Sequence, residues 1–170
     1  SPMKKNLFLF SLFLFFSFCV SASQVGDRTI PAEIAQLTDS LKQKYAPDKR
    51  IALFDVDYSF SGKHVMLRGV TTSAEAKTAL LNGLAKANYK VMDCLQVLPD
   101  EIALEGKVNG IVNVSVANLR SDPDFSSEMM TQGLMGMPVR VLQYDSWYRI
   151  QTPDDYIAWV HRVGIHPVTK

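Results

Sequence analysis

This sequence has few cysteines and a net charge close to zero, and each of these features excludes a class of protein. The 170 residues include two cysteines, Cys19 and Cys94, and the formal net charge is +1. Cys19 falls in an N-terminal apolar segment that we expect to be removed, and one remaining cysteine cannot form an internal disulfide. A net charge near zero provides no basic surface of the kind that attracts nucleic acid. We therefore expect a fold held by its hydrophobic cores and no nucleic-acid partner.

Recognisable catalytic, phosphate-binding and metal-binding motifs are also missing. There is no glycine-rich phosphate loop and no Gly-x-Ser-x-Gly sequence. The three histidines, His64, His161 and His166, have no metal-ligand spacing with cysteine or acidic residues. Cys94 lies in an apolar predicted strand, so we expect a small buried side chain rather than an activated thiolate. The 170 residues are thus expected to hold no catalytic residue, no metal and no cofactor.

The N-terminus has the composition of a secretory signal peptide. Lys4 and Lys5 precede a Phe/Leu-rich segment at 7–18, and Val20-Ser21-Ala22 places small residues where signal peptidase reads the chain. The apolar segment is shorter than the roughly 20 residues that span a bilayer, and a retained membrane anchor is the alternative. We predict a signal peptide at 1–22 and export to the periplasm or cell surface. Cleavage leaves 16 basic and 17 acidic residues.

Residues 29–100 alternate between helical and strand periodicity. Apolar residues at three- and four-residue steps predict a helix that begins at Pro31 and ends near Ala46. Thr72 opens a capping box for a second helix, and Asn88 suits its left-handed end. Period-two segments predict three strands, at 51–58, 64–70 and 90–98. Two helices on one face of a three-stranded sheet would bury both apolar stripes, which makes a small helix-strand-strand-helix-strand domain.

The remainder of the chain predicts a small antiparallel β-barrel after a charged linker at 99–107. One alternating strand is expected at 108–119, followed by a long polar loop at 120–132. Three closely spaced strands follow, divided by turns rich in proline, aspartate and serine, at 138–143, 147–151 and 156–160. Short strands at this spacing are typical of small barrels, which usually bind a ligand and do no chemistry. The fold class is therefore α+β, with an all-β barrel after the helical domain.

The segment LRGVTTSAEAKTALLNGLAKA, at 67–87, and the order of elements around it resemble the BON domain. This small module of exported bacterial proteins is associated with envelope or membrane attachment. The chain has Asn88-Tyr89-Lys90-Val91 where that family usually has a glycine-valine pair. The resemblance implies a BON-like domain at 29–100 with a possible partner in the cell envelope.

A more specific resemblance covers residues 105–165, where several spaced elements agree in order with one family. They are Val116-Ala117-Asn118-Leu119-Arg120, Pro123, Glu128, Thr131-Gln132, Gly136-Met137-Pro138-Val139, Trp147 and Asp155-Tyr156-Ile157-Ala158-Trp159-Val160. The segment resembles the first bacterial SH3-like domain of secreted NlpC-type cysteine peptidases, which cut γ-D-glutamyl–diamino acid bonds in murein stem peptides. Asp155 and Ala158 stand where glycine is usual in that family.

This second resemblance implies an all-β SH3-like barrel that packs beside a papain-like catalytic domain. The barrel would help to wall off the N-terminal end of the substrate. The catalytic cysteine and histidine would lie in a C-terminal domain beyond Lys170, so the parent protein would be a cysteine peptidase and hydrolase.

Two aromatic residues of the barrel are candidates for substrate binding. Period-two geometry places Tyr148 and Ile150 in the core and Trp147 on the opposite face, among polar side chains. An exposed Trp147 would be a platform for sugar or peptide, and the alternative is that it covers the open end of the barrel. Tyr156 and Trp159 are expected to point to opposite faces, so at most one of them faces a ligand, and Tyr156 is the candidate.

Two charged residues that flank the polar loop are the other candidates. Glu128 would bind the amine of L-alanine in a peptidoglycan stem peptide, and Arg120 would bind a D-glutamate carboxylate. The alternative for Arg120 is an ion pair with Asp122 or Asp124 that pins the loop. Asp55, in the first predicted strand, is expected to lie on a solvated strand face.

Three functions remain open at this point. The first is the non-catalytic N-terminal region of a murein stem-peptide endopeptidase, which positions the enzyme at the cell wall and borders its substrate pocket. The second is a stand-alone cell-wall peptide-binding SH3-like adaptor without peptidase activity. The third is a protein-interaction module with no murein role.

Overall fold

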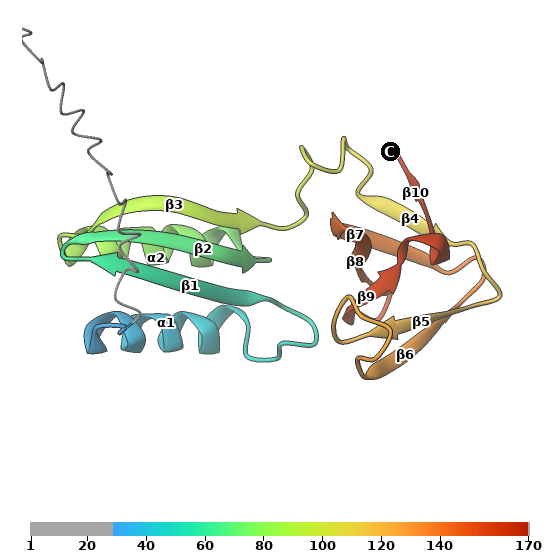
Figure 1. The fold of residues 1–170 in the computed structure, drawn as a ribbon, viewed down its shortest axis with the longest axis horizontal. Coiled ribbons are helices and arrows are strands. Elements are labelled where there is room, and N and C mark those ends of the chain that lie inside the picture. The colour runs from blue at the N-terminus through green and yellow to red at the C-terminus, as the bar shows by residue number, and fades with distance from the viewer. Residues whose placement is uncertain (1–28, 170) are drawn as a thin grey trace, which may run out of the picture.

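The computed structural model describes residues 29–169, so the predicted signal peptide at 1–22 lies outside the described residues. No helix in this range is long and apolar enough to cross a membrane. The elements, in chain order (Figure 1), are α1 (Ala32–Tyr45), β1 (Phe54–Ser61), β2 (His64–Thr71), α2 (Ala74–Lys86), β3 (Lys90–Val97), β4 (Asn109–Val112), β5 (Val116–Arg120), β6 (Met129–Leu134), β7 (Pro138–Asp145), β8 (Trp147–Gln151), β9 (Ile157–His161), a 3-10 turn (Arg162–Gly164) and β10 (Ile165–Val168).

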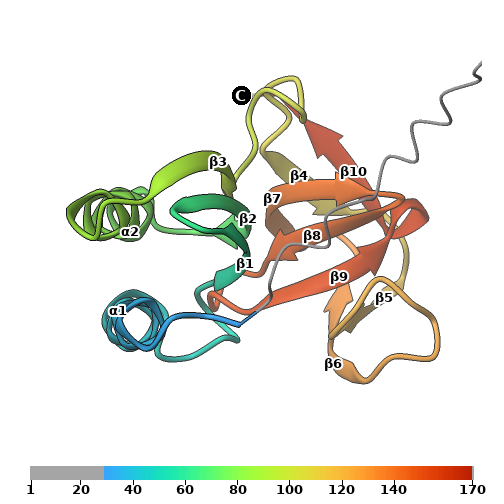
Figure 2. The same ribbon diagram turned by 60° about the vertical axis from the view of Figure 1, so that its left-hand side comes forward.

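Residues 30–98, here called the N-terminal unit, form a three-stranded sheet with both helices on one face (Figure 2). β1 and β2 make an antiparallel hairpin, and α2 carries the chain across to β3, which pairs with β2 in parallel. The apolar stripes of the helices pack on alternate residues of the strands, and Ile34, Leu67 and Leu80 are among the most deeply buried. The predicted helix-strand-strand-helix-strand order and the α+β fold class are confirmed.

Helix α2 begins one residue later than the predicted capping box. Ser73, not Thr72, is the N-cap, and its side chain accepts a hydrogen bond from Ala76 N at 3.1 Å. The Thr72 hydroxyl instead accepts from Leu53 N at 3.0 Å, so it serves the preceding loop. The predicted left-handed end at Asn88 is confirmed by its φ of 61°. Serine and threonine are both favoured N-cap residues, so the local sequence does not distinguish Thr72 from Ser73. The hydrogen bond between Thr72 and Leu53 decides which of them caps the helix.

Cys94 is exposed, and the prediction that it is buried is wrong. The next residue in β3, Leu95, faces the helices and is 2% exposed. Cys94 and Met92 therefore point to the opposite face of the sheet, which neither α1 nor α2 covers. The period-two pattern of an apolar strand does not show which face will be covered, because both faces carry apolar residues.

Residues 104–168, here called the barrel unit, form a seven-stranded sheet in the order β10-β4-β7-β8-β9-β5-β6. The strand predicted at 108–119 is in fact two strands, because the chain breaks after β4 and changes partners. β4 pairs with β7 and β10, whereas β5 pairs with β6 and β9. The loop predicted at 120–132 is shorter than expected, since β6 already begins at Met129.

The three strands predicted after residue 138 are confirmed as β7, β8 and β9. Val139, Val141 and Ile150 are buried in the barrel core, as the alternation predicts, and Tyr148 is only partly buried against it. Asp155 adopts a φ of 70°, a left-handed conformation that aspartate tolerates better than most residues. The turn at this position therefore keeps the backbone conformation that a glycine would adopt.

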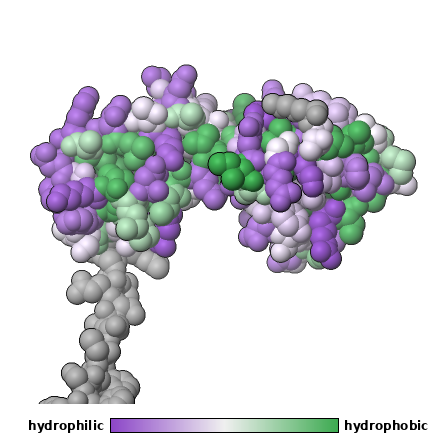
Figure 3. Space-filling model, turned by 90° about the horizontal axis from the view of Figure 1, so that it is seen from above, coloured by the Kyte–Doolittle hydropathy of each residue, from purple (hydrophilic) through white to green (hydrophobic). Residues whose placement is uncertain are grey.

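A third apolar cluster joins the two units. Leu53 and Leu98 come from the N-terminal unit, and Leu142 and Ile157 come from the barrel unit. Backbone hydrogen bonds flank the cluster, from Ile157 N to Arg50 O at 2.7 Å and from Asp100 N to Leu142 O at 2.9 Å. Figure 3 shows the two units as two lobes with apolar residues at the waist between them. The cluster therefore holds the units in a defined relative position, which matters for the cavity between them.

Candidate functional site

A cavity with a volume of about 670 Å³ lies where the two units meet. Both units supply its walls, and Ile157 and Leu53 of the joining cluster form part of its apolar lining. Residues of both charges line it. The charged residues that line it are Lys49, Arg50 and Asp55 from the N-terminal unit and Asp122, Glu128 and Arg149 from the barrel unit.

Glu128 and Tyr156, two of the four predicted substrate-binding residues, line this cavity. Glu128 is exposed at the end of the loop before β6, and the loop is closed at its base by a hydrogen bond from Ser121 N to Glu128 O at 2.9 Å. Tyr156 is half-buried, with the Arg50 guanidinium 6.0 Å from its ring centroid.

Trp159 lines the same cavity as Tyr156, so the prediction that at most one of them faces a ligand site is wrong. The reason is the start of the strand. β9 begins at Ile157, and Tyr156 precedes it in the turn, so strand alternation does not govern the direction of its side chain.

Arg149 of β8 is a charged cavity residue that sequence reasoning did not select. Its guanidinium lies 5.1 Å from the Trp159 ring centroid, the geometry of a cation–π contact. Nη1 donates to Gln143 Oε1 at 3.3 Å, and the buried Nε has no hydrogen-bond partner among residues 29–169. Burial lowers the pKa of Arg149 from its usual value, while the charges of Asp55 and Asp122 oppose that shift.

Alternation alone placed Arg149 on a polar strand face and did not distinguish it from any solvated arginine. The signal that identifies it is the strand register, which pairs Arg149 with Trp159 across β8 and β9.

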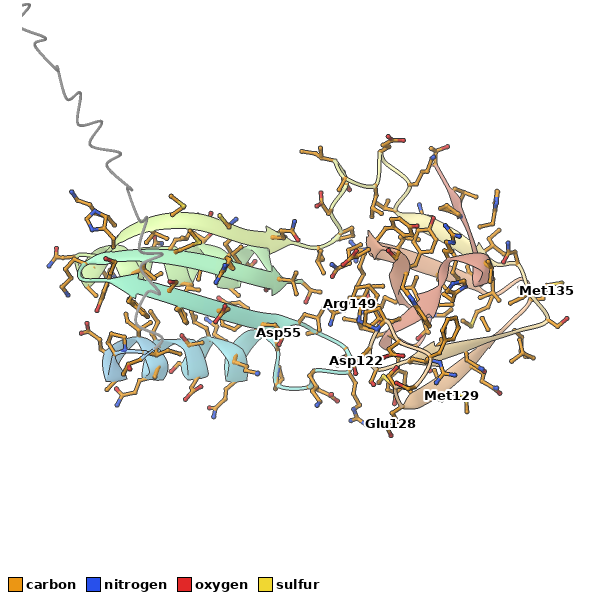
Figure 4. The ribbon with its side chains drawn as sticks, in the orientation of Figure 1. Asp55, Asp122, Glu128, Met129, Met135 and Arg149 are labelled. Carbon is orange, nitrogen blue, oxygen red and sulfur yellow. The ribbon has the colours of Figure 1, made fainter. Side chains whose placement is uncertain are left out.

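Asp55 is exposed on β1, as predicted, but it lies at the end of the sheet where the barrel unit faces it (Figure 4). Gly69, which pairs with Val56 in the β1–β2 hairpin, has a φ of 122°, and a Cβ there would overlap the Asp55 carbonyl oxygen. Glycine at 69 thus permits the local backbone path of β1 beside the cavity.

Trp147 does not line this cavity, and of the two alternatives the exposed platform is wrong. The side chain is 8% exposed, because the loop at 121–128 places Phe125 over it with ring centroids 4.8 Å apart. His161 covers another edge of the indole at 5.2 Å. Trp147 therefore packs beneath the loop and offers no open ring face as a platform. Its edge lines a separate pocket of about 250 Å³.

Arg120 lines that same smaller pocket and not the cavity that contains Glu128. Its Nη1 donates to Ser127 O at 2.7 Å, which fastens the loop. No ion pair joins it to Asp122 or Asp124 among the described residues. Asp124 instead accepts a hydrogen bond from Ser126 N at 2.9 Å, and this hydrogen bonding lowers its pKa, with a smaller effect from the charge of Arg120. Arg120 thus pins the loop through a backbone carbonyl rather than through the expected carboxylate.

Within residues 29–169, no group of three or more histidine, cysteine, aspartate or glutamate side chains is arranged to hold a metal ion. The arrangement at the cavity is instead one of separate positive and negative groups around an apolar floor. Such a surface can hold a small charged molecule by ion pairing.

Comparison with known proteins finds a matching family model and similar solved structures. Residues 119–164 match the family described as the bacterial dipeptidyl-peptidase Sh3 domain. The matched segment includes Glu128, Arg149, Tyr156 and Trp159 of the cavity. NlpC2 from Trichomonas vaginalis is similar at 19% sequence identity with a TM-score of 0.32, over 35% of this chain. The match spans 23% of that chain, and no curated protein matches the sequence.

Proposed function

We propose that residues 29–170 are the exported, non-catalytic N-terminal region of a murein stem-peptide endopeptidase. In this proposal the barrel unit borders the substrate pocket, and the N-terminal unit is a BON-like domain that associates with the cell envelope. An NlpC-type cysteine peptidase domain beyond Lys170 would supply the hydrolysis. The observation that carries the proposal is the position of Glu128 and Tyr156 in one cavity wall, within the segment that matches a peptidase-associated SH3 family.

Glu128 presents a free carboxylate to this cavity. Its side chain is exposed and takes part in no hydrogen bond or ion pair within residues 29–169. A stem peptide that begins with L-alanine carries a free ammonium, which forms a charge-assisted hydrogen bond with a carboxylate. Tyr156 in the same cavity adds an aromatic ring with a polar hydroxyl. The pair therefore supports recognition of the N-terminal end of the peptide.

Calorimetric titration with the dipeptide L-alanyl-γ-D-glutamate and with its N-acetylated form tests the proposal. The free amine should bind about tenfold more tightly than the acetylated form, as expected for one hydrogen bond between charged groups. Glu128→Gln should remove this difference. Glu101→Gln, an exposed glutamate outside the cavity, is the matched control and should retain it. Equal binding of the two peptides by the unaltered protein, or binding of neither, refutes the proposal.

One observation favours the stand-alone adaptor as a second candidate. This chain alone supplies both facing walls of a cavity of about 670 Å³, a volume within the usual range for small-ligand sites. An adaptor should bind the dipeptide with full affinity without any other domain. A substrate-bordering region should bind it weakly and gain affinity when the catalytic domain is joined to it, because part of the pocket belongs to that domain.

A further inference from the structure

Arg149 is a partly buried cation without an ionic partner. Among residues 29–169 it forms no ion pair, its one side-chain hydrogen bond is the 3.3 Å contact to Gln143, and its buried Nε has no acceptor. A guanidinium has five N–H donors in a planar fork, and leaving them unsatisfied away from water is unfavourable. Nothing within the described part of the chain provides the bidentate acceptor that this fork matches.

The surroundings of Arg149 hold it in place for such an acceptor. Its guanidinium lies over the Trp159 ring, which fixes the plane of the fork, and both residues line the cavity between the units. Asp55 and Asp122 lie near enough to influence its charge, but neither forms an ion pair with it. Figure 4 shows Arg149 and Asp55 at the junction, with Asp122 and Glu128 below them. The cation and the surrounding carboxylates therefore line the same cavity without forming an ion pair among residues 29–169.

The other guanidinium of the cavity is already paired. Arg50 binds Asp48 through Nη2 at 2.7 Å and Nε at 3.0 Å, so its fork is occupied by a carboxylate of the same loop. Arg120, which the sequence favoured as the carboxylate receptor, lies in another pocket and donates to Ser127 O. Of the arginines at this cavity, Arg149 is the one whose fork remains available to a ligand.

We propose that Arg149 is the carboxylate receptor of this cavity, so that the bound molecule is a zwitterionic peptide with its ammonium at Glu128 and its carboxylate at Arg149. This inference rests on the proposed function and specifies the second charged contact of the same site. A ligand with a free carboxylate is therefore preferred over the same ligand with that group amidated.

The test uses a matched pair of ligands with the full chain. L-alanyl-γ-D-glutamate carries a free α-carboxylate, and its α-amide differs by the loss of that charge alone. Calorimetric titration should show the acid binding about tenfold or more tightly than the amide, as expected for a charge-assisted bidentate contact. Arg149→Gln should bind both ligands with equal, weakened affinity. Arg140→Gln, an exposed arginine on β7 outside the cavity, is the matched control and should retain the preference.

The outcomes separate this inference from the proposed function. If the unaltered protein prefers the free amine over the N-acetyl form but binds the α-acid and α-amide equally, the proposed function stands and the role of Arg149 is refuted. If it binds neither peptide, both are refuted, because the inference depends on the site. If Arg149→Gln fails to fold, the comparison of acid with amide in the unaltered protein decides alone. A preference for the acid that persists in folded Arg149→Gln also refutes the inference.

Discussion

Leu142→Ala should uncouple the two units of this protein. Leu142 is 1% exposed and belongs to the cluster that joins the units, with Leu53, Leu98 and Ile157 as its other members. Truncation of a buried leucine typically lowers the free energy of unfolding by about 2–5 kcal/mol, through lost transfer free energy and the remaining void. We expect about 3 kcal/mol, because a cluster of four side chains from two separate units cannot close the void without moving one unit. Most of this lost free energy comes from the contact between the two units rather than from the core of either unit.

The chain carries separate spectroscopic reporters for the two units. Its two tryptophans, Trp147 and Trp159, both lie in the barrel unit, whereas helices α1 and α2 both lie in the N-terminal unit. Urea unfolding followed by tryptophan fluorescence therefore reports on the barrel unit, and far-UV circular dichroism is dominated by the helices. In the unaltered protein the two transitions should coincide, as expected of one cooperative system. In Leu142→Ala they should separate, and the m-value of each should fall.

The matched control is Leu134→Ala on the edge strand β6. Leu134 is 64% exposed, and substitutions at such positions usually change the free energy of unfolding by no more than about 0.5 kcal/mol. Coincident transitions in Leu142→Ala, with a midpoint no lower than that of the control, would show that the cluster does not couple the units. The cavity at the junction would then lack the rigid walls that ligand binding requires.

Three further predictions concern single sites. Ser73→Ala should lower the free energy of unfolding by about 1 kcal/mol in urea titration, because the Ala76 amide loses its hydrogen-bond acceptor. Ser73→Asp should restore the stability, and an unchanged free energy of unfolding in Ser73→Ala would contradict the assignment of the cap. Hydrogen bonding with Arg50 lowers the pKa of Asp48 from 3.8 to about 2 in the folded protein, so its stabilising contribution is present above pH 3.8 and is lost as the pH falls through about 2. Carboxyl NMR titration should give that value, and a normal pKa would contradict the contact. Cys94 should react with a thiol reagent in the folded protein as fast as in the unfolded one, with the site assigned by peptide mapping, and protection would contradict its exposure.

The ends of the helices and most strand positions could be predicted because they depend on neighbours in sequence. The helix from Pro31 to Ala46, the left-handed Asn88 and the three strands after residue 138 follow from apolar periodicity and turn residues. Two of the wrong predictions required knowledge of a second element. The exposure of Cys94 depends on which face the helices cover, and the burial of Trp147 depends on a loop that folds back over it.

The candidate site was predicted in part for the same reason. Glu128 and Tyr156 stand in motif positions of the barrel segment, so the sequence was enough to select them. Arg149 was not selected, because its distinguishing features are a cross-strand contact with Trp159 and the absence of an ion-pair partner within residues 29–169. Both are properties of the folded chain, and alternation describes only the side of the strand on which a residue lies.

The order of periodicities along this chain determined by itself that an α+β unit precedes a β-barrel, since helical and strand repeats are encoded locally. Only the tertiary structure decided that these units share an apolar cluster and enclose a charged cavity. The residues that join there are far apart, as with the hydrogen bond from Gln151 to Ile51 across 100 positions. Such contacts depend on shape and register summed over both units, and no local pattern of apolar and polar residues specifies them.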